Sequence, residues 1–226
     1  MRRLSWLGPE PLRSLLAIGA HSDDIEIGCG GTILSLARSC PDVRVHWLVL
    51  AAHGDRVDEA RTSAEAFLDG LREPTVEILS RRDGYLPYEA IEVKDTFERL
   101  KARVDPDLVL THRRDDLHQD HRLVCDLTWN TFRDHVVLEY EIPKYDGDLG
   151  RPNAFVALEH DVVARKLELL DAHFGSQRSK DWFEEGVFRG LMRLRGMECR
   201  SSSGYAEAFT ARKLSIEVGG SRPRGL

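Results

Sequence analysis

The amino-acid sequence predicts an α/β protein with a Rossmann-like three-layer fold, a mostly parallel sheet and an active site at the C-terminal edge of the strands. Through the first two-thirds of the chain, short apolar runs of strand length alternate with longer segments whose apolar residues recur at helical spacing. This order predicts a parallel sheet covered by helices on both faces and joined by right-handed crossovers. Polar residues crowd together after two of the predicted strands, at 21–26 and 116–121, and α/β proteins place their chemistry at that edge.

The first predicted strand is the apolar run 15–20, and the run 43–50 gives the second. Three further strands are expected at 75–79, 107–111 and 136–140. Helices are expected between them, at 30–39, 57–68, 91–104 and 119–132. The last third predicts helices at 160–174 and 182–197, and it leaves open whether segment 205–216 returns to the sheet. We expect one domain over residues 1–226, with a frayed tail from about residue 219.

The composition limits the classes of partner. Lys and Arg number 32 and Asp and Glu number 38, which gives a formal net charge of −6 over 226 residues; neither nucleic acid nor a membrane surface is therefore expected as a partner. No stretch approaches the roughly 20 apolar residues of a membrane span, and interrupting charges and prolines near the N-terminus argue against a signal peptide. The four cysteines are scattered without a Cys-x-x-Cys pair, which predicts reduced thiols in a cytoplasmic protein.

The two polar clusters contain the residue types of a mononuclear metal site. His21 and Asp24 are three residues apart, as are His118 and His121, so one turn of chain can direct each pair at a single point. Imidazole and carboxylate groups are common zinc ligands, and a catalytic zinc site uses three of them and keeps one position open. The remaining carboxylates of the clusters provide candidates for the base that takes a proton from the attacking water.

The clusters also resemble the two motifs of the LmbE-like, or PIG-L-like, family of zinc-dependent N-deacetylases. The first family motif is Ala-His-Pro-Asp-Asp followed by acidic residues and Gly-Gly, and residues 20–32 read AHSDDIEIGCGGT. The second is Asp-x-His-x-Asp-His, and residues 116–121 read DLHQDH. Weaker similarity at 54–59 and 205–209 extends the resemblance over roughly residues 14 to 210.

The resemblance implies a metal centre and a base. Carried over residue by residue, it implies that His21, Asp24 and His121 bind Zn²⁺ and that Asp23 is the general base. It also implies a small-molecule substrate, an amino sugar or an amino-sugar conjugate. Fe²⁺ and Co²⁺ suit the same ligands, so other divalent transition metals stay open.

Further roles follow from the same resemblance. His118 matches the side chain that polarises the amide oxygen or protonates the leaving amine. Asp120 matches the carboxylate that orients His118 and raises its pKa, so that the imidazole stays protonated near neutral pH. Arg56 matches a position that faces the substrate.

Several residues keep two interpretations at this stage. Glu26 is either a carboxylate stabilised at a helix start or a substrate contact. His53 and His112 follow predicted strands and either line the pocket or have structural roles. Ser22 and Gln119 replace residues that are usually proline in the family, a change expected to affect loop stiffness rather than metal binding.

The leading functional hypothesis is a zinc-dependent hydrolase that removes an N-acetyl, or other N-acyl, group from an amino sugar or its conjugate. A first alternative keeps the site but changes the reaction, to a metal-dependent hydratase or lyase acting on carboxylated aromatic breakdown products. A second is a member that binds metal or ligand without turnover; the presence of both the ligand set and the expected base argues against it. The sequence identifies neither the sugar nor the pathway, and it leaves a homo-oligomer open.

Overall fold

A computed structural model describes residues 12–215, which form a three-layer α/β fold around a seven-stranded sheet. The sheet order is β3-β2-β1-β4-β5-β7-β6. The strands are β1 Ser14–His21, β2 Arg44–Ala51, β3 Thr75–Ile78, β4 Leu108–His112, β5 Val136–Tyr140, β6 Ala154–Ala157 and β7 Ala206–Thr210. The predicted fold class is confirmed, whereas the predicted frayed tail lies outside the described residues.

The first five strands are parallel, and the last two run antiparallel to their neighbours. β1 pairs in parallel with β2 and β4, and the same orientation continues to β3 and β5. β7 pairs antiparallel with both β5 and β6. The chain therefore moves outward from β1 in one direction through β2 and β3, then returns to the other side of β1 with β4. The junction of β1 and β4 is the topological switch point, where open α/β sheets bind their ligands.

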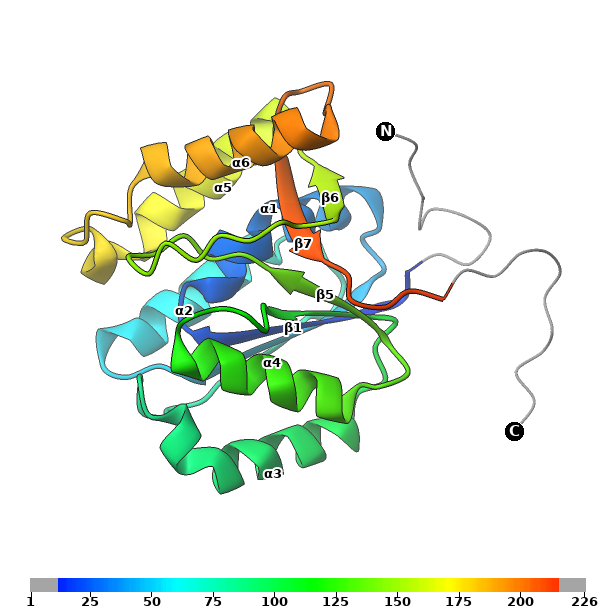
Figure 1. The fold of residues 1–226 in the computed structure, drawn as a ribbon, viewed down its shortest axis with the longest axis vertical. Coiled ribbons are helices and arrows are strands. Elements are labelled where there is room, and N and C mark those ends of the chain that lie inside the picture. Colours follow the sequence, from blue (N-terminus) through cyan, green and yellow to red (C-terminus); the bar gives the residue numbers. More distant parts are fainter. Residues whose placement is uncertain (1–11, 216–226) are drawn as a thin grey trace, which may run out of the picture.

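Six α-helices cover the two faces of the sheet (Figure 1). Their bounds are α1 Asp24–Ser39, α2 Asp55–Phe67, α3 Ala90–Lys101, α4 Gln119–Thr131, α5 His160–His173 and α6 Glu185–Cys199, with short 3₁₀ turns at Leu86–Glu89 and Gly175–Gln177. Helices α3 and α4 lie on one face, and α1, α2, α5 and α6 lie on the other.

Alternation along the central strands divides the core between the two faces. In β1, Leu15 and Ala17 belong to the apolar cluster under α1, α2 and α5, whereas Leu16 and Ile18 belong to the cluster under α3 and α4. All of these side chains are buried. Parallel strands enclosed on both faces read as continuous apolar runs, which explains why 15–20 and 43–50 could be recognised as strands.

Helix α1 differs most from the sequence prediction because it begins at Asp24, six residues before the expected start at residue 30. Its glycines concealed the helical pattern, and the structure gives them a packing role. A Cβ at Gly28 would overlap the ring of Tyr140, and one at Gly30 would overlap the ring of Phe67. The glycines thus let the first turns of α1 lie close to β5 and α2.

Two further differences concern the last third of the chain. Strand β6 was not predicted, because four residues at the edge of a sheet leave no recognisable periodic pattern. Helix α6 starts at Glu185 rather than 182, after a turn over 178–184. Within the segment 205–216, residues Ala206–Thr210 return to the sheet as β7.

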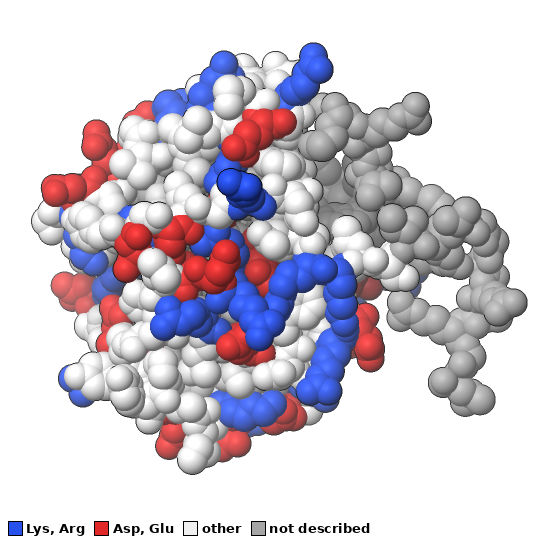
Figure 2. All heavy atoms as spheres, viewed as in Figure 1, with Lys and Arg blue, Asp and Glu red and all other residues white. Residues whose placement is uncertain are grey.

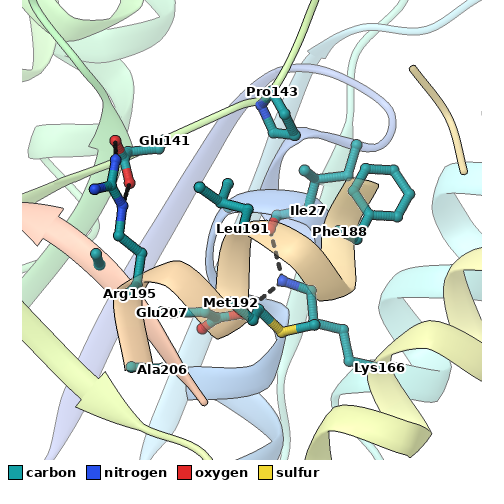
Figure 3. A pocket seen from close by; sticks show the side chains of 12 residues that line it. Ile27, Glu141, Pro143, Lys166, Phe188, Leu191, Met192, Arg195, Ala206 and Glu207 are labelled. Carbon is teal, nitrogen blue, oxygen red and sulfur yellow. Dashed lines mark hydrogen bonds and ion pairs between the residues drawn. The ribbon is translucent and has the colours of Figure 1, made fainter. Parts of the chain in front are cut away.

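Buried ion pairs hold β7 and α6 against the remainder of the fold. Lys166 donates to the Ile27 carbonyl at 2.6 Å and to Glu207 at 2.7 Å (Figure 3). Glu207 in turn accepts from the backbone N–H groups of Gly31 and Thr32. The Ile27 carbonyl and the Gly31 N–H would pair with each other in a regular helix. The Lys166–Glu207 pair thus contacts the polar groups of one turn in the first half of α1. It lines a cavity of about 20 Å³, which the ion pair of Arg195 and Glu141 also lines.

The surface carries both signs of charge. On the face seen in Figure 2, acidic and basic side chains are interspersed, as the near balance of 32 basic and 38 acidic residues predicts. None of the helices between residues 12 and 215 combines the length and apolar character that crossing a bilayer requires.

Candidate metal centre

The fold brings the two sequence clusters together at the switch point of the sheet. His21 is the last residue of β1, and Asp23 and Asp24 begin α1 directly after it. The next strand in the sheet, β4, leads into the second cluster, where His118 precedes α4 and His121 lies in its first turn. All of these residues except His118 are buried.

One ring nitrogen of each of His21 and His121 and both carboxylate oxygens of Asp24 lie close together, with spacings near those of a tetrahedral metal site. His21 Nδ1 lies 3.1 Å from His121 Nε2 and 3.3 Å from Asp24 Oδ2, and His121 Nε2 lies 3.5 Å from Asp24 Oδ1. Ligand atoms around a tetrahedral ion with bonds of about 2.0–2.1 Å are separated by roughly 3.3 Å. The donor set implied by the family resemblance therefore fits a divalent ion.

The outer nitrogens of both histidines face carboxylates. His21 Nε2 lies 3.1 Å from Asp120 Oδ2 and 3.1 Å from Asp83 Oδ1. His121 Nδ1 lies 3.1 Å from Asp116 Oδ2. A hydrogen on each outer nitrogen leaves the inner nitrogen free as an electron-pair donor, which is how carboxylates set the tautomer of metal-binding histidines.

The buried charges fix the protonation of this centre. Burial opposes ionisation of Asp24, but His121, His112 and His21 outweigh burial and hold the pKa of Asp24 well below its usual range. Burial, together with the nearby His112, lowers the pKa of His121 to about 4. In the absence of an ion, Asp24 is therefore a carboxylate and His121 a neutral imidazole, the forms that bind metal. Burial opposes protonation of His21, but Asp24, Asp120 and Asp83 outweigh burial and hold the pKa of His21 well above its usual range, so this ring must release a proton to bind an ion.

Other histidines could complete or change the ligand set. The ring nitrogens of His118 come close enough to those of His21 and His121 to share an ion, and His112 forms a similar group with Asp24 and His121. His112 is the last residue of β4, and its Nε2 accepts the N–H of Ala20 at 2.9 Å. His53, by contrast, is exposed.

Asp23 lies beside the candidate ligands with one oxygen free. Its Oδ1 accepts from Arg56 at 2.9 Å, whereas the buried Oδ2 has no hydrogen-bond partner among residues 12–215. Burial raises the pKa of Asp23, and the Arg56 guanidinium counteracts this rise. Such a carboxylate can accept a proton from a molecule in the site.

The structure changes the expected relation between His118 and Asp120. The Asp120 carboxylate contacts His21 and accepts the backbone N–H groups of Gly84 and Leu86, and only the Asp120 backbone N–H reaches His118, at Nδ1 and 3.3 Å. The expectation that this carboxylate orients His118 is therefore wrong. Burial and the nearby His21 lower the pKa of His118, so the expected raised pKa is also wrong.

These contacts define the tautomer of His118. Because Nδ1 accepts the Asp120 N–H, the neutral ring carries its hydrogen on Nε2. A neutral imidazole in this tautomer can donate a hydrogen bond to a developing oxyanion without being charged.

The surroundings of Glu26 do not support its interpretation as a substrate contact. The side chain is fully buried, and neither carboxyl oxygen has a hydrogen-bond partner among residues 12–215. Burial raises its pKa well above the usual range, so the group is a neutral acid inside the protein.

Two contributors escaped the sequence analysis, and the role of a third was left open. Asp83 contacts His21 from the loop after β3, and this contact lowers the pKa of Asp83 to about 2. Lys144 donates to Asp116 at 3.0 Å and also to Asp148, so it ties the segment after β5 to the partner of His121. His112 was recognised only as a histidine following a strand. No local motif marks these residues, since they join the site through tertiary contacts.

A mostly parallel sheet with a candidate metal centre and an adjacent free carboxylate at its switch point defines a three-layer α/β protein with polar groups gathered where this fold class binds ligands. The family comparison is more specific. Residues 16–132, more than half of the 226-residue chain, match the family described as "PIG-L: GlcNAc-PI de-N-acetylase". The chain belongs to this family.

Solved structures of similar fold include both deacetylases and a hydratase. N,N'-diacetylchitobiose deacetylase from Pyrococcus horikoshii is 21% identical with a TM-score of 0.63, and 88% of this chain and 83% of that chain are covered. 4-Carboxy-2-hydroxymuconate hydratase from Pseudomonas putida is 18% identical with a TM-score of 0.68, and 93% of this chain and 100% of that chain are covered. A zinc-inhibited form of teicoplanin deacetylase is 14% identical with a TM-score of 0.70, and 87% of this chain and 96% of that chain are covered. At these identities the similarity concerns the fold.

Proposed function

We propose that this protein is a metal-dependent hydrolase that removes an N-acetyl, or other N-acyl, group from an amino sugar or an amino-sugar conjugate. The observation that carries the proposal is the convergence of His21, Asp24 and His121 beside the unpartnered Oδ2 of Asp23. This arrangement offers a place for an ion and a base next to it, the two requirements of amide hydrolysis by an activated water.

The comparisons support the substrate class. The family description names the removal of an acetyl group from a GlcNAc lipid conjugate. Two of the similar structures are deacetylases, of diacetylchitobiose and of teicoplanin. We therefore favour an acetamido sugar, free or joined to another group, as the small-molecule substrate.

The ligand residues suit zinc, and other divalent transition ions share the same preference for nitrogen and oxygen donors. An ion held by His21, Asp24 and His121 would acidify a water molecule and polarise the amide oxygen. The carboxylates of Asp120 and Asp116 hold the two histidines in the orientation this requires.

The residues of the chain perform the proton transfers. Asp23 takes a proton from the attacking water at Oδ2 and later gives it to the departing amine nitrogen, so that one water and one amide yield acetate and a free amine. His118 keeps its proton and donates a hydrogen bond from Nε2–H to the oxyanion of the tetrahedral intermediate. The lowered pKa of His118 suits this role, because it keeps the imidazole neutral. Since Nδ1 accepts the Asp120 N–H, the ring carries its single hydrogen on Nε2 and can donate it in a hydrogen bond.

A hydratase is the second candidate function, because the fold of 4-carboxy-2-hydroxymuconate hydratase covers 93% of this chain with a TM-score of 0.68. The same base and ion could add water to a carbon–carbon double bond. A member without turnover is disfavoured, because Asp23 and the three candidate ligands are all present.

We also propose the compartment of the protein and its kinds of partner. The cysteines Cys29, Cys40, Cys125 and Cys199 are all unpaired, which supports a reducing compartment such as the cytoplasm. Neither nucleic acid nor a membrane is proposed as a partner. A homo-oligomer is compatible with the fold.

Screening tests the proposed function. Zinc-loaded protein is incubated with free N-acetylated sugars, with N-acetyl sugars joined to lipid or aromatic groups, and with carboxylated dienoates. Acetate and free amine should appear in equal amounts from at least one acetamido compound. Loss of dienoate absorbance without acetate from any compound would favour the hydratase instead.

A further inference from the structure

The guanidinium group of Arg56 bridges two residues of the first motif. Arg56 lies in the first turn of α2. Its Nε donates to Ser22 Oγ at 2.9 Å, and its Nη2 donates to Asp23 Oδ1 at 2.9 Å. Nε and Nη2 belong to one edge of the planar guanidinium, so the two bonds together fix both its position and its orientation.

This bridge is largely enclosed by protein. Ser22 is 0% exposed and Asp23 is 3% exposed, and the Arg56 side chain is 20% exposed. Hydrogen bonds to charged groups contribute more when water is excluded from them. The inner edge of the guanidinium is thus occupied by the protein itself, which leaves only its outer part for contact with a substrate.

The two oxygens of Asp23 consequently have different surroundings. Oδ1 is held by Arg56, whereas Oδ2 is buried and has no partner within residues 12–215. Rotation of the carboxylate would break the bond to Arg56. The contact therefore keeps Oδ2 as the oxygen that is available to accept a proton.

Ser22 supplies the second anchor of Arg56. This position is usually proline in the motif that the chain resembles, and proline has no hydroxyl group with which to accept the Arg56 Nε–H. Besides any effect on loop stiffness, serine at this position adds a hydrogen bond next to the base.

We propose that Arg56 is a positioning residue for Asp23, held in place by Ser22, and that its main role is to orient the base rather than to bind substrate. The inference rests on the proposed function, since it assigns a role within the same reaction. It also revises the expectation that Arg56 faces the substrate.

Steady-state kinetics with the acetamido compound identified by the screen test this role. Arg56→Ala should lower kcat by about 10- to 100-fold, the scale expected for a misplaced catalytic group, while KM changes by less than about twofold because uniform binding is not lost. Added guanidinium ion should restore part of kcat. Ser22→Ala should lower kcat by a smaller factor, and it should have no further effect in the Arg56→Ala background.

Controls separate this role from general damage to the fold. Arg61→Ala removes an exposed arginine from the same helix and should leave both kinetic constants unchanged. Zinc content and melting temperature should match the wild type in Ser22→Ala, which deletes only one hydroxyl group. Arg56→Lys keeps the charge without the fork, so its kcat should lie between those of the wild type and Arg56→Ala.

Three results would overturn the inference. A rise in KM at unchanged kcat in Arg56→Ala would make Arg56 a substrate-binding residue. A full effect of Ser22→Ala in the Arg56→Ala background would show that Ser22 acts through another contact. Wild-type protein that releases no acetate from any compound would instead remove the proposed function, and the inference with it.

Discussion

The imidazole rings of His112 and His121 are stacked, with centroids 3.9 Å apart and planes inclined by 15°. His112 accepts the N–H of Ala20, lies 3.2 Å from Asp24 Oδ2 through the same nitrogen, and contacts the hydroxyl group of Tyr140. It therefore forms the buried floor beneath two of the candidate ligands. This floor joins the ends of β1, β4 and β5 in one contact network.

Loss of this floor should weaken metal binding. His112→Leu keeps a side chain of similar size but removes the acceptor of the Ala20 N–H. Zinc affinity, measured by competition with a chelator, should fall by about 10- to 100-fold, the usual effect of removing a residue that supports metal ligands. His53→Leu, at an exposed position in the loop after β2, is the control. Equal affinities in a folded His112→Leu variant would show that the stacking has no role in ligand placement.

Replacement of the base should separate turnover from metal binding. Asp23→Asn keeps an oxygen that can accept from Arg56 but cannot take up a proton. Zinc content should stay near the wild-type value, and turnover should fall by about 10²–10⁴-fold, the scale of general base catalysis. Glu26→Gln is the matched control, because burial already keeps that carboxyl group neutral. A larger loss in Glu26→Gln than in Asp23→Asn would transfer the role of base to Glu26.

Two helical glycines should respond in opposite directions to alanine. Gly28→Ala in α1 forces a methyl group into the ring of Tyr140 and should destabilise the protein by about 1–3 kcal/mol, as overpacking does. Gly190→Ala in α6 meets nothing within 4 Å and should stabilise it by up to about 1 kcal/mol through helix propensity. Urea unfolding of both variants measures these changes. Destabilisation of similar size in both would contradict the packing assigned to Gly28.

The pH dependence of stability should reveal the surroundings of His46. Burial lowers its pKa despite the contact with Glu77 at 3.0 Å, so the unfolded chain, with a pKa of about 6.5, binds this proton more readily than the folded protein. Stability is therefore lost as the pH falls below about 6.5 toward the folded pKa.

Comparison with His46→Gln isolates this contribution. Unfolding free energies of the wild type and the variant should be measured in urea between about pH 7.5 and 5.5, the range that spans the unfolded pKa. The wild type should lose stability relative to the variant as the pH is lowered. A difference that is constant with pH, or that grows in favour of the wild type, would mean that the pKa of His46 is not lowered by folding.

The central strands could be predicted because burial on both faces makes each of them a continuous apolar run. The same reasoning could not recover β6, since an edge strand of four residues has no such run. It also missed the start of α1, because Gly28 and Gly30 disfavour a helix locally, and only the rings of Tyr140 and Phe67 explain their presence.

Part of the candidate site could be predicted because its residues lie close together in the sequence. His21, Asp24 and His121 lie in short motifs, so the sequence alone could associate them. Asp83 and Lys144 lie far from the motifs and reach the site through the folding of loops. The pKa of His118 was mispredicted because it depends on burial and on the direction of the Asp120 carboxylate, neither of which sequence spacing determines.

Titration of metal-free protein with zinc, with released acetate as the readout, tests the central claim most directly. We expect no acetate from the chelated protein, and activity that rises with added zinc and saturates near one equivalent, because the proposal places a single ion between the three ligand candidates. His121→Ala should neither retain zinc nor regain activity at the same concentrations. Full activity of the chelated wild type, or of His121→Ala without bound metal, would contradict the account.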